Sequence, residues 1–578
     1  SYTFLDHFTA QTNIQFNYSE VSLDIFNPIA SFGSGKVFNV DRSSVFEGLD
    51  YFRDYTFDAF LKYENVFNDV HKLNVLLATS VFKTTGEYTG ATGFDIPGNN
   101  PINANLEQSS DIENINRATG INATFDSRLL SYFTRVQYDY KGKYLFSAVV
   151  RRDGSTKFGP ENQFGYFPSG SLGWVVSDED FLNDSNAINF LKIRASYGIL
   201  GNDRIPDYRF VSLLNGEGIY FFNDQEFIGT ASGGIANPEI RWEKQKTIDI
   251  GVDMRLFDNK VDITADYFKK RTEDLLVIPE VSGLLGVGGP PVVNGGEVQN
   301  EGLEFAIGYS GNFNDNFKFG VRYNITYIKN EVLSVNTNTG VLEGGSFGIG
   351  QPAPSRMEAG FPLGYFYGYQ TDGVFQTQAE INSSAIGTPI PEPGDIKFVD
   401  QNGDGVIDLD DKVDIGNPIP DATMGLNITL DYKNFDFAAY AFASIGNEIV
   451  RNYQNNNVLT NSTIGSLNRW TGAGSTNLYP RVTGGTSPNN LFSDYFVEDG
   501  SFVRLQNVQL GYTFSSDALE GSKISKLRIY LTGSNLFTLT EYSGFDPTAS
   551  SGDPLGGGID QGFYPTAKQF LLGINLKF

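Results

Sequence analysis

The last ten residues, 569–578 (QFLLGINLKF), alternate between apolar positions and positions that are mostly small or polar. Every even position from 570 is apolar: Phe570, Leu572, Ile574, Leu576 and Phe578. A period of two predicts a β-strand with one apolar face and one polar face. A terminal strand that ends on an aromatic residue is typical of an outer-membrane β-barrel, in which the last strand pairs with the first.

The same alternation recurs along the chain and predicts further strands at 248–256, 261–267, 317–327, 426–432, 508–514 and 527–531. A tilted strand of roughly 9–11 residues is long enough to cross a bilayer. The pattern therefore predicts membrane-spanning strands.

The connections between these strands alternate in length. Short ones are expected near 141–142, 257–259, 312–315 and 433–434, and long ones at about 87–127, 200–241, 271–300, 328–420, 446–501 and 538–567. Short periplasmic turns and long extracellular loops are the barrel pattern. If Phe578 lies on the periplasmic side, every long connection falls outside the cell.

The predicted fold class is an all-β, transmembrane antiparallel β-barrel with about sixteen full strands and a partial strand at 1–7. The alternative is a soluble solenoid, propeller or multi-sandwich protein. Such folds do not predict a strict alternation of short and long connections, nor a loop as long as 328–420 within one domain.

Composition agrees with a barrel. Aromatic residues make up 14% of the 578 residues, although the mean hydropathy is only −0.24, as expected when strands face lipid on one side and water on the other. No apolar run approaches the ~18 residues of a membrane helix. The net charge of −26 and the lack of a basic patch argue against nucleic-acid binding.

Candidate catalytic chemistry is sparse. Cysteine is absent, and His7 and His71 are the only histidines, so thiol chemistry is excluded and histidine triads are not expected. The sequence contains no P-loop, no Gly-x-Ser-x-Gly elbow and no zinc pattern. We therefore expect no enzymatic activity.

Residues 400–411 (DQNGDGVIDLDD) have the spacing of a calcium loop. The predicted ligands are side-chain oxygens and one backbone carbonyl, from Asp400, Asn402, Asp404, Val406 (carbonyl), Asp408 and Asp411. Gly405, at position 6, permits the sharp bend, whereas Asp411 stands where glutamate is usual. We expect Ca²⁺ to clamp the 328–420 loop, and the alternative is a solvated acidic turn.

Two further clusters are candidates for surface roles. Tyr365, Tyr367 and Tyr369 could stack on sugar rings or on apolar peptide side chains, or could pack the loop onto the barrel rim. Residues 151–153 (Arg-Arg-Asp) predict an ion-pair cluster at the rim.

Several strings occur in a characteristic order: RRDGSTKF at 151–158, GYFPS at 165–169, LKIRASYG at 191–198, NPEIRWE at 237–243, NEGLE at 300–304 and GYFYGY at 364–369. From about residue 128 to the end, the chain resembles the SusC/RagA family of TonB-dependent outer-membrane transporters from Bacteroidetes. The resemblance implies import of oligosaccharides or oligopeptides, driven by TonB, under a SusD-like surface lipoprotein.

The resemblance also implies a 22-stranded barrel with a plugged lumen. About 16 of those strands are expected here, with the N-terminal plug and the first strands outside the sequence. Because an open sheet edge cannot lie in lipid, the first strand needs a partner from elsewhere. A fragment and one piece of a split barrel both fit this expectation.

Two other functions remain open from the sequence. One is a structural or docking barrel in a larger outer-membrane assembly or secretion complex, with the long loops as protein interfaces. The other is a passive porin, which would conduct ions, whereas a plugged importer would not.

Overall fold

A computed structural model describes residues 1–578 except 35–38, 112–115, 118–123, 183–184, 213, 215, 224, 232, 280–289, 349–350, 454–463, 485, 516, 549 and 551. The chain divides into two compact units. Unit 1 comprises Ser1–Leu172, Gly198–Gln245 and Leu276–Asn294, and unit 2 comprises Gly173–Tyr197, Lys246–Leu275 and Gly295–Phe578.

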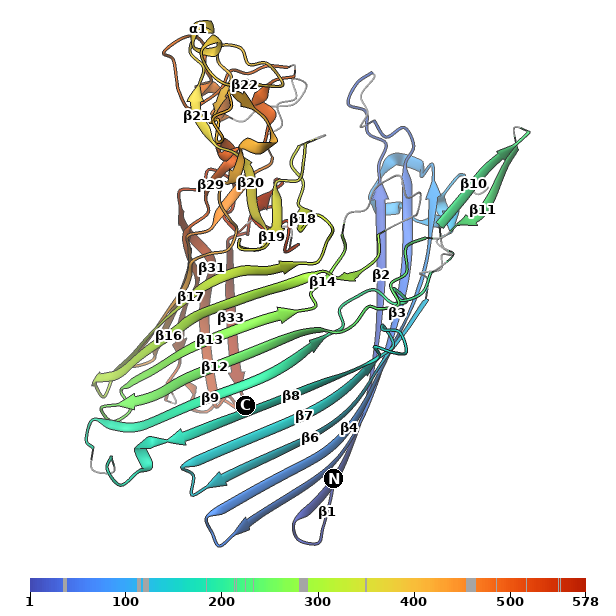
Figure 1. Cartoon of the computed structure of the whole chain (residues 1–578). Coiled ribbons are helices and arrows are strands. Elements are labelled where there is room, and N and C mark those ends of the chain that lie inside the picture. The colour runs from blue at the N-terminus through green and yellow to red at the C-terminus, as the bar shows by residue number, and fades with distance from the viewer. Residues whose placement is uncertain are drawn as a thin grey trace. The chain divides into compact units, whose positions relative to one another are not determined.

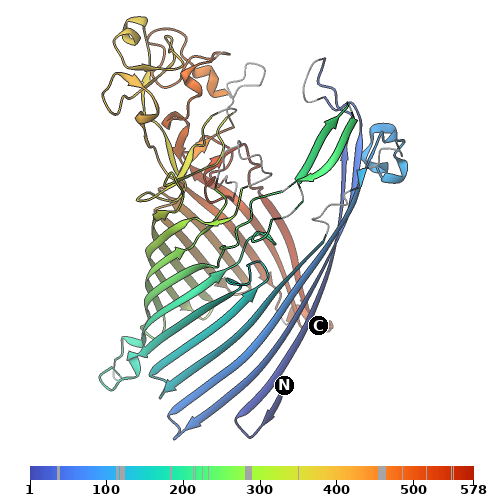
Figure 2. The ribbon, with the colours of Figure 1, turned by 45° about the vertical axis from the view of Figure 1, so that its right-hand side comes forward.

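Unit 1 is built on an antiparallel sheet whose strands follow one another along the chain. Its strands are β1 (Tyr2–Phe4), β2 (Phe8–Asn27), β3 (Ser44–Phe67), β4 (His71–Phe94), β5 (Asn116–Arg117), β6 (Thr124–Tyr140) and β7 (Tyr144–Ser155). Figure 2 shows the blue strands β2, β3 and β4 running side by side. Two short hairpins, β10 (Gly216–Phe222) with β11 (Gln225–Ala231) and β14 (Leu276–Val277) with β15 (Val293–Asn294), complete the unit.

The strands β3 and β4 are longer than the sequence pattern predicted. They pair over 24 residues each, up to Ser44 opposite Phe94, so the long connection predicted to start at about residue 87 starts after Phe94 instead. The end of β4 is rich in glycine and threonine, which resembles a loop in sequence. An added Cβ at Gly86 would lie 2.0 Å from the ring of Phe125, so any larger residue there would displace that ring.

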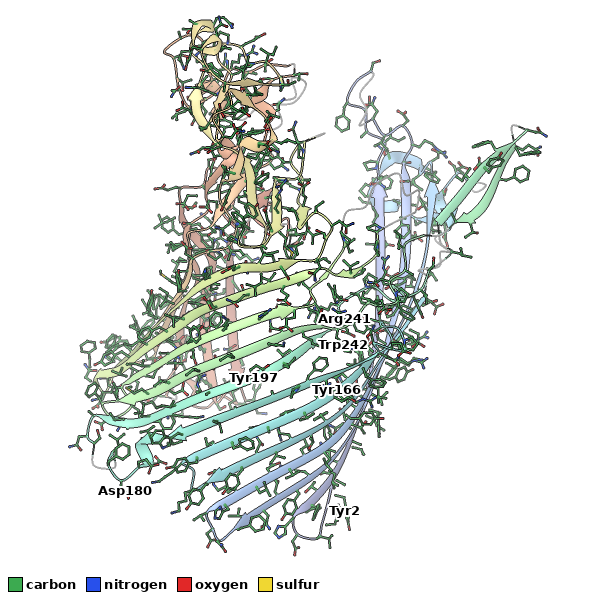
Figure 3. The ribbon with its side chains drawn as sticks, viewed as in Figure 1. Tyr2, Tyr166, Asp180, Tyr197, Arg241 and Trp242 are labelled. Carbon is green, nitrogen blue, oxygen red and sulfur yellow. The ribbon has the colours of Figure 1, made fainter. Side chains whose placement is uncertain are left out.

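The buried core of unit 1 combines residues of the connections with Phe167 on β8. Its members are apolar side chains with at most 6% exposure: Phe158, Phe167, Ile205, Ile240, Trp242 and Val292. The indole N–H of Trp242 donates to the backbone carbonyl of Gln163. Figure 3 labels Trp242 beside Arg241, in the segment that precedes β12.

Unit 2 contains a second run of antiparallel strands. They are β13 (Val261–Glu273), β16 (Gly296–Asn314), β17 (Phe317–Val335), β26 (Ala422–Tyr432), β27 (Phe435–Ile445), β30 (Phe502–Thr513), β31 (Lys526–Thr540) and β33 (Gln569–Lys577). Each pairs with the next in chain order. The predicted terminal strand is thereby confirmed as β33, which pairs with β31.

Three more strands, β8 (Phe164–Val175), β9 (Ile188–Asn202) and β12 (Glu243–Leu256), have residues in both units. With them, the described residues form sixteen strands of nine or more residues, and β1 is the expected partial strand. The short connections are also confirmed. For example, Phe257, Asp258 and Asn259 all have positive φ, a conformation that Asn and Asp tolerate in tight turns.

The only α-helix among the described residues is α1 (Gln378–Asn382). No helix in the described part of the chain is long and apolar enough to span a membrane.

The two faces of β26 allow a direct test of the assignment of lipid and lumen faces. Ile428 lies opposite Val321 and Ala439, whereas its neighbour Asn427 points to the other face. We expect Ile428→Arg to cost about 2–4 kcal/mol of folding free energy in a bilayer, since charge on the lipid face near the midplane is unfavourable. Asn427→Arg should cost little, because it faces the lumen. Equal losses of refolding yield into lipid vesicles for both variants would contradict the face assignment.

Candidate functional site

Three long connections of unit 2 fold together into one body, which we call the loop assembly. It consists of the described residues between β17 and β26, between β27 and β30, and between β31 and β33. Figure 1 shows several of its elements gathered beyond the ends of β17 and β31. We consider it the candidate functional site, because loops held by a rigid scaffold commonly carry binding functions.

Short strands join the three connections. The first connection holds β18 (Val341–Gly344), β19 (Ser355–Glu358), β20 (Tyr365–Tyr369), β21 (Thr371–Val374), β22 (Ile386–Gly387), β23 (Ile396–Phe398), β24 (Val406–Ile407) and β25 (Lys412–Asp414). The second holds β28 (Glu448–Arg451) and β29 (Val497–Asp499), and the third holds β32 (Ile559–Asp560). Because β28 pairs with both β29 and β32, the second and third connections share a small sheet.

The loop assembly has its own hydrophobic core, drawn from all three connections. Its buried members are Phe347 and Phe366 from the first, Val450, Phe492 and Phe496 from the second, and Ile559 from the third. All are at most 6% exposed. A core shared in this way ties the three connections into one body, since none of them could bury these side chains alone.

The aromatic run at 365–369 forms β20, at the centre of this packing. Tyr365 is 1% exposed and its hydroxyl donates to Glu358 Oε2 at 2.5 Å. Burial and this hydrogen bond raise the pKa of Tyr365. Tyr369 is 6% exposed and its ring lies 5.0 Å from that of Phe398. The packing interpretation therefore describes both residues.

Tyr367 differs from its neighbours, because its side chain is only half-buried. The guanidinium of Arg356 lies 3.6 Å from the centre of its ring, which is the geometry of a cation–π contact. A role for the three tyrosines in substrate binding stays a prediction, and only Tyr367 keeps a partly accessible ring.

A buried ion pair joins the first and second connections. Asp395 is fully buried and accepts from Arg481 Nε at 2.7 Å. The Asn489 amide donates to the same carboxylate oxygen at 2.9 Å. A buried carboxylate is costly without such partners. The pair therefore keeps two segments together although its residues are 86 positions apart in the sequence.

A second buried pair joins the third connection to the barrel strand β30. Arg504 donates to Asp546 Oδ1 at 2.6 Å, and both side chains are at most 8% exposed. Burial alone would raise the pKa of Asp546, but hydrogen bonds from Thr566, Thr548 and Arg504 outweigh it and hold that pKa well below its usual range. The Asp546 carboxylate is therefore ionised, and it fastens the third connection to β30.

The turn at 400–411 has the compact shape that its spacing suggests. Asp400 accepts from the N–H groups of Gly403 and Gly405, and Asp404 accepts from that of Val406. Gly403 and Gly405 both have positive φ. Asp411 is fully buried and accepts from the N–H groups of Gln401 and Asp408.

The predicted ligand oxygens are thus hydrogen-bonded within the turn. Asn402 and Asp404 are also linked to each other, and Asp408 accepts from the Asp410 N–H. Among the described residues, no group of three or more His, Cys, Asp or Glu side chains is arranged to hold a metal ion. The donor set is nonetheless all oxygen, as Ca²⁺ prefers, and calcium binding stays a prediction.

The sequence did not reveal the two ion pairs. Asp395, Arg481, Arg504 and Asp546 lie in irregular segments or at a strand end, where no periodicity marks them. The scarcity of basic residues in this long polar connection could have drawn attention to Arg481, because it is one of only two arginines between residues 452 and 500.

Comparison with known proteins places the fold. The family model described as "TonB dependent receptor-like, beta-barrel" matches residues 1–536. TonB-dependent receptor P3 of Formosa agariphila is 33% identical over 595 residues, covering 100% of this chain and 57% of that protein. TonB-dependent receptor SusC of Bacteroides thetaiotaomicron is 31% identical over 461 residues, covering 78% of this chain and 44% of that protein.

A solved structure agrees on the fold. The structure of the RagAB peptide transporter superimposes with a TM-score of 0.81 at 22% identity, covering 100% of this chain and 60% of that one. The class is therefore an all-β, antiparallel transmembrane barrel of the outer membrane. The chain belongs to the TonB-dependent receptor β-barrel family, in its SusC/RagA-like group. It spans about half the length of the curated relatives that it matches.

The ion pair of Asp395 and Arg481 generates a prediction about the loop assembly. We expect Asp395→Ala to destabilise it by about 1–3 kcal/mol, because the buried donors of Asn489 and Ser487 lose their acceptor, although Arg481 keeps its ion pair with Glu392 at 2.8 Å. The readout is faster hydrogen exchange of the backbone amides at 394–398 and 487–491 in the full-length protein.

A matched control exists in the same segment. Asp372 pairs with Lys397 at 2.7 Å but is 63% exposed, so Asp372→Ala should cost about 0–1 kcal/mol. If the two variants exchanged at the same rate, the buried pair would not be what holds the connections together.

Proposed function

We propose that this chain is the barrel part of an outer-membrane importer that takes up oligosaccharides or oligopeptides. Import would be energised through TonB and assisted by a SusD-like surface lipoprotein. Support comes from the family and from relatives whose names are TonB-dependent receptor and SusC. The fold is also that of the RagAB peptide transporter.

The observation that carries the proposal is the loop assembly itself. The three connections share a core, one buried ion pair joins the first to the second, and another joins the third to β30. The chain therefore presents a preorganised surface rather than independent mobile loops. Binding sites on rigid supports hold their geometry better than sites on free loops. A polymer-derived substrate, or a lipoprotein that presents it, is a suitable ligand for so large a surface.

The alternative is a docking barrel within a larger outer-membrane assembly or secretion complex. The same rigid surface would then bind another structural component. An importer delivers substrate to the periplasm, and its uptake depends on the transmembrane energy supply. A docking barrel is expected to do neither.

An uptake assay in the native host tests the proposal. Labelled oligosaccharide and oligopeptide pools are offered to cells that carry the full-length protein, its Asp395→Ala variant or the Asp372→Ala control. We expect Asp395→Ala to reduce uptake several-fold at equal amounts of protein in the membrane, and a protonophore to abolish it. Unchanged uptake of every pool, together with loss of a co-purifying secretion component, would favour the docking function instead.

We also propose that Ca²⁺ binds the turn at 400–411 and stiffens the first connection. The oxygens of Asp400, Asn402, Asp404 and Asp408 and the carbonyl of Val406 would hold it, with Asp411 closing the turn. The support is the loop spacing and the two positive-φ glycines.

Titration of the purified full-length protein with CaCl₂ tests this second proposal. We expect Asp404→Ala to weaken Ca²⁺ binding by about tenfold or more, because it removes a charged ligand. Asp410→Ala is the matched control, since Asp410 is exposed and lies at a position that supplies no ligand. Identical calorimetric curves for all three proteins, or no heat of binding at all, would exclude the site.

A further inference from the structure

One face of the unit 1 sheet changes from apolar to basic along its strands. On β4 this face begins with Leu73, Val75 and Leu77, continues through Thr79 and Val81, and then reaches Lys83. On β6 the apolar part of the same face ends at Leu130, which pairs with Val81. The next residue of that face is Arg128, which pairs with Lys83. We call this face the outward face, because its apolar part has the pattern of a lipid-facing surface.

Aromatic rings border the apolar part of the outward face at both ends. At the turn end, ring contacts link Tyr138 to His71, His71 to Tyr140, and Tyr140 to Tyr144. At the other end are Tyr55 and Tyr132, with Phe164 and Tyr166 on β8, of which Tyr166 is labelled in Figure 3. From His71 to Val81 the strand matches the ~9–11 residues that cross a bilayer, so the two aromatic borders mark the two membrane interfaces.

Four basic side chains lie at the border farther from the turns. They come from four strands in succession and form what we call the basic row: Arg53 on β3, Lys83 on β4, Arg128 on β6 and Arg152 on β7. The guanidinium of Arg152 lies 3.8 Å from the ring centre of Phe164 and 5.8 Å from that of Tyr166. The row is thereby continuous with the aromatic border.

Acidic partners are few at this level. Asp126 pairs with Lys83 at 3.1 Å and with Arg128 at 2.8 Å. In the described part of the chain, no carboxylate forms an ion pair with Arg53 or Arg152. The next carboxylates on this face, Glu87 and Glu20, lie opposite Tyr51, farther from the apolar band. The basic row therefore has excess positive charge where the face meets the membrane.

Unit 2 provides an internal contrast. Its corresponding face also turns from apolar to charged, at Tyr267, Leu303 and Tyr327. There, however, Lys269 pairs with Glu301 and Lys329 pairs with Glu331, and Arg271 pairs with Glu297. Each of these bases has its own carboxylate, so that surface is close to neutral.

We propose that the basic row of unit 1 binds the phosphorylated headgroup of an outer-leaflet lipid. Short barrel turns lie on the periplasmic side, so the border farther from the turns meets the outer leaflet. Arginine and lysine bind phosphate oxygens through charge-assisted hydrogen bonds, and the acyl chains would cover the apolar band below. Lys83 and Arg128 are 37% and 59% exposed, so a headgroup can reach them.

Lipid binding to the full-length protein in detergent tests the proposal. The probes are lipid A carrying phosphate groups and the same lipid after removal of the phosphates, each titrated and detected by native mass spectrometry. We expect the phosphorylated form to bind more tightly. The double variant Lys83→Gln and Arg128→Gln should weaken it about thirtyfold, since each basic residue near an anionic surface contributes about fivefold.

Two control variants separate charge from folding. Lys72→Gln with Lys141→Gln removes two charges next to the turn end of the same strands and should leave binding unchanged. Lys83→Arg with Arg128→Lys keeps the charges and should bind as the unmodified protein does. Equal affinity for both lipid forms would overturn the proposal, as would loss of binding in the charge-conserving variant to the same extent as in the neutral one.

Discussion

The bilayer requires that every backbone N–H and C=O within it be paired by protein, and the rest of this structure follows from that requirement. Paired strands meet this requirement through uninterrupted ladders of backbone hydrogen bonds, such as that of β3 with β4 over 24 residues. A ladder also fixes which face each side chain occupies. The lipid face, the lumen face and the height of each residue are therefore set together by the same hydrogen bonds.

The ladders continue where the bilayer no longer requires them, and there the polarity of the faces can change. On β2, Ile14, Phe16 and Tyr18 share one face, while Val21, Leu23 and Ile25 share the other. The pairing with β3 has no register shift between these groups, so the apolar side of the strand changes without a bulge. Polar side chains on a lipid-facing surface are unfavourable, so we expect this part of β2 to lie above the membrane, where the outer face meets water.

Periodicity in the sequence predicted much of this architecture because a period of two reports the face of each residue directly. It identified β33, the short turns and the number of long strands. It did not predict the extent of β4, because Gly86 and the threonines around it have the composition of a loop, and only pairing with β3 makes them a strand. Nor did it separate Tyr365 from Tyr367, since a buried aromatic residue and a half-buried one have the same sequence signal.

The loop assembly was beyond the reach of periodicity for a different reason. Its stability comes from contacts between connections, such as Arg481 with Asp395 and Ile559 with Val450, and no local pattern records a partner so far along the chain. Outside the lipid, water can satisfy a loose backbone, so nothing obliges these connections to be ordered. Their order depends on the hydrophobic core of the loop assembly and on buried charges that are costly unless they are paired. So costly an arrangement is expected at a surface that must hold its shape. Recognition by this protein should therefore be sought at the loop assembly rather than at the barrel wall.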